Sequence, residues 1–236
     1  MYQISELITN IDAHMTPLLI YGTIANLLAY VQMLYGAWIG FRDRSHAVPL
    51  AANTLFLAHD SYYVYNHDYW FNTINHPFFI GNWYAMAIFV CIELTIAWQI
   101  ITYSRNEVGL GNTWFKAFIS YVAIQVGMYI LFLWLRSMID DPLYVICFAL
   151  SVVVANIFNI PMLLNRGNRK GQSLWIAGAI TIQTGPVVFF LVNPLLTKAF
   201  LSPIWVLAGL TNTVLAAVYF VMLWKAPPYK VATEPH

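Results

Sequence analysis

The sequence is poor in charged residues and in cysteine. Only 9% of its 236 residues are charged, against roughly 25% in a soluble domain, so most of its surface must face something other than water. The net charge of +1 excludes the basic face that a nucleic-acid partner requires. The two cysteines, Cys91 and Cys147, lie in apolar stretches, which excludes a disulfide framework.

Long apolar runs are abundant, since 60% of the residues are hydrophobic. A helix needs about 20 apolar residues to cross roughly 30 Å of hydrocarbon, and lipid does not tolerate open backbone. The sequence therefore predicts an all-α membrane protein, a bundle of seven transmembrane helices in a single domain over residues 1–236. The expected spans are about 17–41, 48–66, 78–103, 114–135, 142–165, 173–193 and 204–224.

The basic residues are distributed unevenly between the two sides of this bundle. Nine of the 11 Lys and Arg residues fall on one side and two on the other. Because positive residues gather on the cytosolic side, we expect the N-terminus outside or lumenal and the C-terminus cytosolic. The protein would be a multi-pass protein of the endoplasmic reticulum in a eukaryote or of the plasma membrane in a bacterium. The larger set is Arg42, Arg44, Arg105, Lys116, Arg166, Arg169, Lys170, Lys225 and Lys230, and the smaller is Arg136 and Lys198.

Two of the basic loops are similar to each other. The first span is followed by FRDRSHAVPL and the fifth by LNRGNRKGQSL. One interpretation is a parallel repeat, in which spans one to three match spans five to seven around the fourth, a 3+1+3 arrangement. The other is that any two cytosolic loops are basic. Substrate sites often lie where such repeats meet.

Two carboxylates lie inside expected spans, where an ionisable group is costly and usually faces the bundle interior. They are Asp60, within AHDSYYVY, and Glu93, within VCIELTIAW. With no cation in any span beside them, either carboxyl can retain its proton and act as a general acid. Alternatively, each simply bonds a neighbouring helix. We expect His59 to be a hydrogen-bond partner of Asp60 rather than a metal ligand, because His59, His67 and His76 lack ligand spacing.

Three short motifs carry a resemblance to a known family. They are YVQMLYG at 30–36 followed by RDR at 42–44, PLAAN at 49–53 leading into HDSYYVY, and RGNRKGQSLW at 166–175. In these motifs the chain resembles the seven-helix integral membrane terpene cyclases of fungal meroterpenoid and indole-diterpene biosynthesis and their bacterial relatives. The resemblance implies cyclisation of a prenylated, lipophilic small molecule in terpenoid secondary metabolism. It implies no metal and no cofactor, an acid in the second helix that protonates an epoxide or alkene, and an assisting carboxylate in the seventh.

Carried over to this sequence, the resemblance makes Asp60 the proton donor and Glu93 an auxiliary acid or base. The acid of the family stands nearer the Asn of PLAAN, where this chain has Leu57, and Asn212 replaces the carboxylate of the last helix. The acid layout is therefore rearranged. The other candidate binding residues are His59 beside the acid, Asn212 as a polar positioner, and Tyr62, Tyr63, Trp83 and Trp98 as stabilisers of a cation.

Two other functions remain open from the sequence. The first is a small seven-helix solute transporter of the paired-repeat type, in which Asn156, Asn159 and Gln183 would bind the solute near the membrane midplane. The second is a non-catalytic subunit or a lipid-binding scaffold, in which the carboxyls would not share a cavity. A transporter predicts a central polar path, whereas a cyclase predicts a pocket open to lipid or to the lumen.

Overall fold

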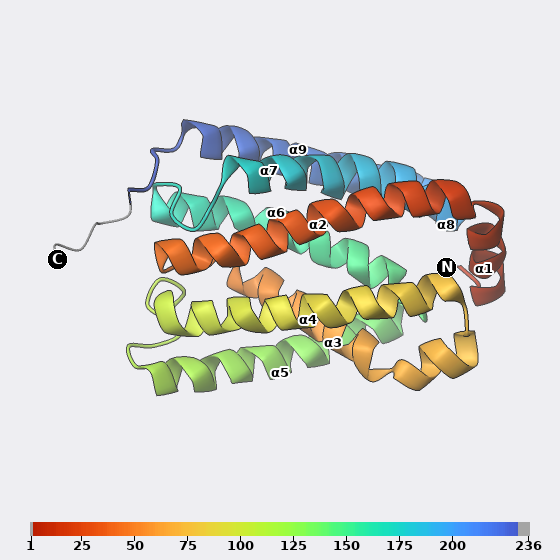
Figure 1. Ribbon diagram of the computed structural model, residues 1–236, viewed down its shortest axis with the longest axis horizontal. Helices are drawn as coiled ribbons and strands as arrows, with labels where there is room; N and C mark the ends of the chain where they lie inside the picture. The colour runs from red at the N-terminus through yellow and green to blue at the C-terminus, as the bar shows by residue number, and fades with distance from the viewer. Residues whose placement is uncertain (1, 231–236) are drawn as a thin grey trace.

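The computed structural model describes residues 2–230, which form only helices and connecting loops (Figure 1). Short π-helical segments are written η1 and η2, and a 3-10 turn η3. The elements are α1 (Ile4–Ala13), α2 (Met15–Asp43), α3 (Leu50–Tyr65), η1 (Tyr69–Ile74), α4 (Pro77–Tyr103), α5 (Trp114–Ile139), α6 (Val145–Arg166), α7 (Leu174–Ile182), η2 (Gln183–Val192), α8 (Asn193–Leu196), η3 (Lys198–Leu201) and α9 (Pro203–Lys225).

Within the described part of the chain, six helical segments are long and apolar enough to cross a membrane. They are α2, α4, α5, α6, the continuous segment Leu174–Leu196 and α9. Helix α3, expected as a further span at 48–66, has 16 residues. It is therefore about 24 Å long and falls short of roughly 30 Å of hydrocarbon.

Helix α3 lies inside the bundle, where it packs against α4, α5 and α6. Its central residues are buried, including the polar side chains of Asn53, Thr54, His59 and Asp60. A helix that is surrounded by other helices does not need an apolar outer face. This position explains why α3 has the polar sequence that its neighbours lack.

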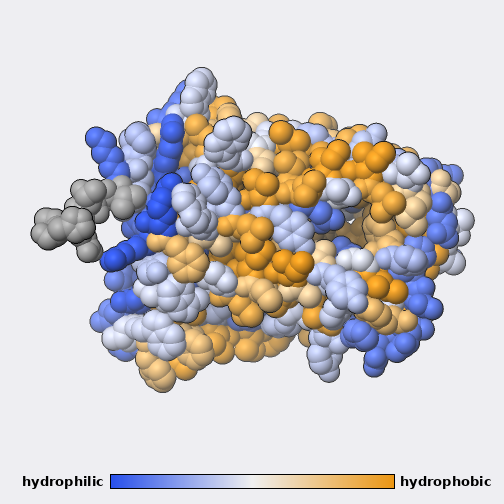
Figure 2. Space-filling model, viewed as in Figure 1, coloured by the Kyte–Doolittle hydropathy of each residue, from blue (hydrophilic) through white to orange (hydrophobic). Residues whose placement is uncertain are grey.

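The long helices run side by side along the long axis of the molecule, and helix α1 and the C-terminal end of α9 lie at opposite ends of it (Figure 1). Figure 2 shows apolar side chains across the middle of one face and polar side chains gathered towards both ends. We call the end formed by the loops 44–49, 104–113 and 167–173 and by residues 226–230 the basic end. Arg136 and Lys198 lie at the opposite end.

The opposite end is closed by short elements that the expected spans did not include. Helix α1 is held there by a hydrogen bond from Asn10 Nδ2 to the carbonyl oxygen of Leu196, 3.0 Å long. The hydroxyl of Tyr2 donates to the carboxylate of Asp141, which also accepts from the backbone N–H groups that begin α6. These contacts tie the first residues of the chain to α6 and α8.

Candidate functional site

A cavity lies at the centre of the bundle, between α2, α3 and α4 on one side and α6, α7 and η2 on the other. The space between its walls, including the part open to the outside, is about 770 Å³. We call it the acid cavity, because both carboxylates singled out in the sequence line it. Its polar lining residues are Asn26, Gln32, Asp60, Glu93, Asn156, Asn159, Gln183 and Thr184.

Three buried side chains form a chain of proton-carrying groups at this cavity. Nδ1 of His59 lies 2.5 Å from Oδ1 of Asp60, and the carboxyls of Asp60 and Glu93 are close enough to share a hydrogen bond. We call His59, Asp60 and Glu93 the acid relay. Its members come from consecutive positions of α3 and from the middle of α4.

The hydrogen-bond partners restrict where the protons of the relay lie. Nε2 of His59 is 3.3 Å from the carbonyl oxygen of Tyr144, and a carbonyl only accepts, so Nε2 carries a proton. Nδ1 then either accepts a proton from Asp60 or donates one to it. A hydrogen bond between two carboxyls also requires a proton on one of them. One arrangement that satisfies both is an Asp60 carboxylate that accepts from protonated His59 and from protonated Glu93.

One oxygen of the relay is buried without a hydrogen-bond partner. Oε2 of Glu93 is buried and has no hydrogen-bond partner among the described residues, and Glu93 lines the acid cavity. A buried polar atom without a partner costs about 1–3 kcal/mol. A bound molecule that supplied a partner would recover that cost.

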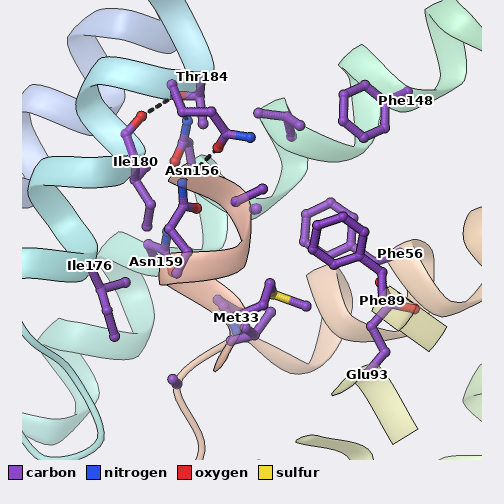
Figure 3. A pocket seen from close by; sticks show the side chains of 18 of the residues that line it. Met33, Phe56, Phe89, Glu93, Phe148, Asn156, Asn159, Ile176, Ile180 and Thr184 are labelled. Atoms are coloured by element: carbon purple, nitrogen blue, oxygen red, sulfur yellow. Dashed lines mark hydrogen bonds between the residues drawn. The ribbon is translucent and has the colours of Figure 1, made fainter. Parts of the chain in front are cut away.

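Aromatic rings cover the wall beside the acids. Phe56 and Phe89 lie near Glu93, and Phe148 lies beyond them on the same side, across the cavity from Asn156, Asn159 and Thr184 (Figure 3). The ring of Phe89 is fixed by a stacked contact with Tyr30, with ring centroids 4.4 Å apart. The negative face of an aromatic ring attracts a cation, so this wall suits positive charge on a bound molecule.

Amide side chains form the facing wall, and Asn212, which lies behind this wall, forms hydrogen bonds with it. Nδ2 of Asn156 donates to Oδ1 of Asn212 over 2.7 Å and to the hydroxyl of Thr184 over 3.0 Å. Nδ2 of Asn212 donates to the carbonyl oxygen of Thr184. Asn212 is fully buried and does not line the cavity, whereas Oδ1 of Asn156 is left without a partner in the described chain.

A second cavity, larger than the first, lies beside it towards the opposite end. We call it the lateral cavity. The two cavities share Asn26, Phe148 and Gln183 in their walls. His59 lines the lateral cavity, whereas Asp60 lines the acid cavity. The hydrogen bond between His59 and Asp60 therefore connects the two spaces.

The structure brings together some of the residues expected from the sequence and separates others. Asp60, Glu93, Asn156, Asn159 and Gln183 line the acid cavity, and His59 and Tyr63 line the lateral cavity. The other four lie in neither wall, and one of them is Asn212, described above. Tyr62 packs on Phe132 and under the guanidinium of Arg136, Trp83 bonds the carbonyl oxygen of Val64, and Trp98 lies on the outer face of α4 beside Phe41.

The sequence interpretation missed the phenylalanines. Phe56 stands four residues before Asp60, and Phe89 four residues before Glu93. Residues four apart share one face of a helix, so this spacing could have placed a ring beside each acid. Phe148 had no such signal, since α6 carries no acid.

No group of three or more His, Cys, Asp or Glu residues among residues 2–230 is placed to hold a metal ion. Cys91 and Cys147 are free thiols. Comparisons of the chain with protein-family models, curated proteins and solved structures found no match.

Proposed function

We propose that this protein is a membrane-embedded, cofactor-independent isomerase of the terpene-cyclase type. It would protonate an alkene or epoxide of a prenylated, lipophilic molecule and direct ring closure. The observation that carries the proposal is the unpartnered Oε2 of Glu93, which belongs to a proton-holding relay in the wall of an aromatic cavity. The resemblance to membrane terpene cyclases supports the same reaction.

In this reaction the proton that Glu93 shares with Asp60 is released from Asp60 and transferred from Glu93 to an alkene carbon or to an epoxide oxygen. The alkene π bond or the epoxide C–O bond breaks, and positive charge develops on carbon beside Phe56 and Phe89. A second alkene of the substrate then supplies the electrons of the new C–C bond. Loss of a proton from the cyclised cation to the Glu93 carboxylate restores the relay, so the product is an isomer of the substrate.

The proposal changes the roles expected from the resemblance, in which Asp60 donates and Glu93 assists. Asp60 is engaged by His59 on one side and Glu93 on the other, whereas Glu93 has the free oxygen. Asp60 is then the anion that orients the Glu93 proton, and His59 balances its charge. Asn156 and Asn159, on the facing wall, would hold a polar group of the substrate.

We further propose that the chain crosses the membrane seven times with its basic end in the cytosol. Six segments are long and apolar enough to cross. Of these, α2 ends at one end of the bundle and the next, α4, begins at the other (Figure 1). Helix α3 joins them and so supplies the seventh crossing. Its shortness is compatible with this role, because its neighbours shield it from lipid.

The decisive experiment is a turnover assay on membranes that carry the wild type, Glu93→Gln or Asp60→Asn, offered a panel of prenylated and epoxidised substrates. We expect the wild type to form a product of unchanged mass. Both substitutions remove an acid from the relay and should lower kcat by about 100-fold or more, the scale of general acid catalysis. Asp68→Asn is the matched control, since its side chain is 93% exposed; it should retain wild-type turnover.

Conversion of a substrate at wild-type rate by well-inserted Glu93→Gln would exclude Glu93 as the acid. Absence of conversion by the well-folded wild type across the panel would count against the enzyme and favour the alternative below. Product analysis by mass spectrometry distinguishes an isomer from a hydrated or cleaved product.

A solute transporter is the second candidate, because of one observation. The acid cavity lies between α2–α4 and the group α6, α7 and η2. These elements belong to the two halves of the 3+1+3 repeat suggested by the sequence, and sites of transporters often lie at such boundaries. Uptake of a solute into proteoliposomes, abolished by Asn156→Leu and accompanied by no chemical change, would favour the transporter over the enzyme.

A further inference from the structure

The lateral cavity opens on the apolar surface of the molecule. Figure 2 shows a hollow in this surface between α2 and α4. From α2 the cavity is lined by Leu18, Leu19, Gly22 and Thr23, and from α4 by Gly81, Asn82, Ala85 and Met86. It is therefore entered from the side of the bundle rather than from either polar end.

Two glycines keep the rim of the opening wide. A Cβ atom added at Gly22 or at Gly81 would meet nothing within 4 Å. Further along, the same two helices are joined, because the hydroxyl of Tyr30 donates to the carbonyl oxygen of Ala85 over 3.2 Å. The opening is therefore a gap between helices that are fixed to each other nearby.

The depth of the opening places it at the edge of the hydrocarbon. Helix α2 has 29 residues and is about 43 Å long, about 13 Å more than a bilayer core of roughly 30 Å. If the excess is divided between both ends, Gly22, seven residues into α2, lies about 4 Å inside the hydrocarbon. The side chains of Leu19, Ile20 and Ile88 beside the gap are more than half exposed, as lipid-facing groups are.

One polar atom in this cavity lacks a partner. Nδ2 of Asn193 is buried and has no hydrogen-bond acceptor within residues 2–230, and Asn193 lines the lateral cavity. An amide nitrogen buried without an acceptor is costly, so turning this side chain toward a ligand with an acceptor group would recover that cost. The rest of the wall is mainly aliphatic and aromatic.

We propose that the lateral cavity binds a bilayer-dissolved amphiphile, an isoprenoid chain with a hydroxyl or carbonyl group at one end, which enters between α2 and α4. The polar end accepts a hydrogen bond from Asn193, near the membrane edge. The chain extends past Phe148, which both cavities share, so its far end reaches the acid cavity. The isoprenoid class of this ligand rests on the proposed function, whereas entry from the bilayer between α2 and α4 rests on the lateral cavity alone.

The test uses the full-length protein in lipid nanodiscs and a farnesol analogue that carries a photoreactive diazirine. We expect saturable labelling of peptides from α2 and α4 that unlabelled farnesol suppresses. In Gly22→Trp and Gly81→Trp the indole fills the opening, and labelling should fall about tenfold, equivalent to roughly 1.4 kcal/mol. Gly127→Trp on α5 is the matched control, since Gly127 also has open space around it; it should label as the wild type does.

Two further variants separate the site from misfolding and from the reaction. Gly22→Ala adds a Cβ that meets no atom and should retain labelling, which excludes a general intolerance of substitution at this position. Asn193→Leu should weaken labelling by the farnesol analogue but not by a diazirine hydrocarbon of equal length. Glu93→Gln should be labelled normally even if turnover is lost, so failure of the enzyme proposal would leave this one standing. Unsaturable labelling of equal strength in all variants would overturn it.

Discussion

At the residue scale, side chains of the basic end hold loops together. Asp43, in the RDR motif, accepts a hydrogen bond from the backbone N–H of Gly171. Arg166 donates to the carbonyl oxygens of His46 and Lys170 and forms an ion pair with Glu107. The motifs that carry the resemblance to terpene cyclases therefore have a structural role in this chain, since they fasten the loop after α2 to the loop after α6.

His46 gives this cluster a dependence on pH. Burial, together with the positive charges of Arg166 and Lys170, holds the pKa of His46 well below its usual value. One of its ring nitrogens accepts from the Arg166 guanidinium, which a fully protonated ring cannot do. Below about pH 6.5 His46 becomes protonated in the unfolded chain but stays neutral in the folded chain. The free energy of unfolding therefore falls as pH falls, by up to about 1.4 kcal/mol per pH unit.

Thermal unfolding in detergent between pH 5 and pH 8 measures this effect. We expect the midpoint to fall below about pH 6.5 in the wild type and to fall less in His46→Gln, which has no proton to take up. His67→Gln is the control, since the His67 side chain is 51% exposed, and its pH profile should match the wild type. If the unfolding midpoint of His46→Gln fell with pH as steeply as that of the wild type, His46 would not be the source of the pH dependence.

At the scale of elements, the segment from α7 to α8 departs from a regular α-helix. Pro186 lacks a backbone N–H and lies within η2, where a proline removes a hydrogen bond and crowds the preceding turn; the π-helical turn accommodates it. Gly185, beside it, allows α9 to approach closely. A Cβ at Gly185 would lie 1.7 Å from Oγ1 of Thr213 and 3.0 Å from its Cα.

We therefore expect Gly185→Ala to destabilise the protein. The hydroxyl of Thr213 is anchored to the carbonyl oxygen of Gly209, so the added methyl would force η2 and α9 apart, at a cost of about 1–3 kcal/mol. Because Gln183 and Thr184 precede this contact and line the acid cavity, turnover should fall as well. Gly127→Ala has open space on α5 and should unfold at the wild-type temperature. Equal unfolding temperatures for the two variants would show that the contact between η2 and α9 accommodates the added methyl group, against this prediction.

At the scale of the whole molecule, seven crossings require the two chain ends to lie on opposite sides of the membrane. We expect Gln3→Cys and Pro228→Cys, each in a Cys91→Ser background, to react differently with a membrane-impermeant maleimide in sealed vesicles of known orientation. Only the cysteine at position 3 should react from outside, and both should react after permeabilisation. Reaction of both in sealed vesicles would show that α3 does not cross.

The sequence determined the parts of this structure that depend on composition along the chain. Apolar runs predicted helices at nearly the observed bounds, because lipid-facing residues must be apolar over a fixed length. The same cost of burying charge drew attention to Asp60 and Glu93, and the adjacency of His59 and Asp60 predicted their hydrogen bond, which the structure confirms. Helix α3 is the exception. It is shorter than the hydrocarbon is thick, because its neighbours shield it from lipid, and composition alone does not reveal such shielding.

The tertiary structure alone decided which of the polar residues meet. Asp60 and Glu93 are far apart in sequence, and no local pattern fixes the rotation of α3 against α4; packing does, and it directs both acids into one cavity. It also places Asn212 behind Asn156 and leaves Trp98 on the outside. The gap between α2 and α4 is likewise a tertiary feature. It exists because the two helices are in contact at Tyr30 and Ala85 and separate near Gly22 and Gly81, and the sequence of neither helix alone determines this.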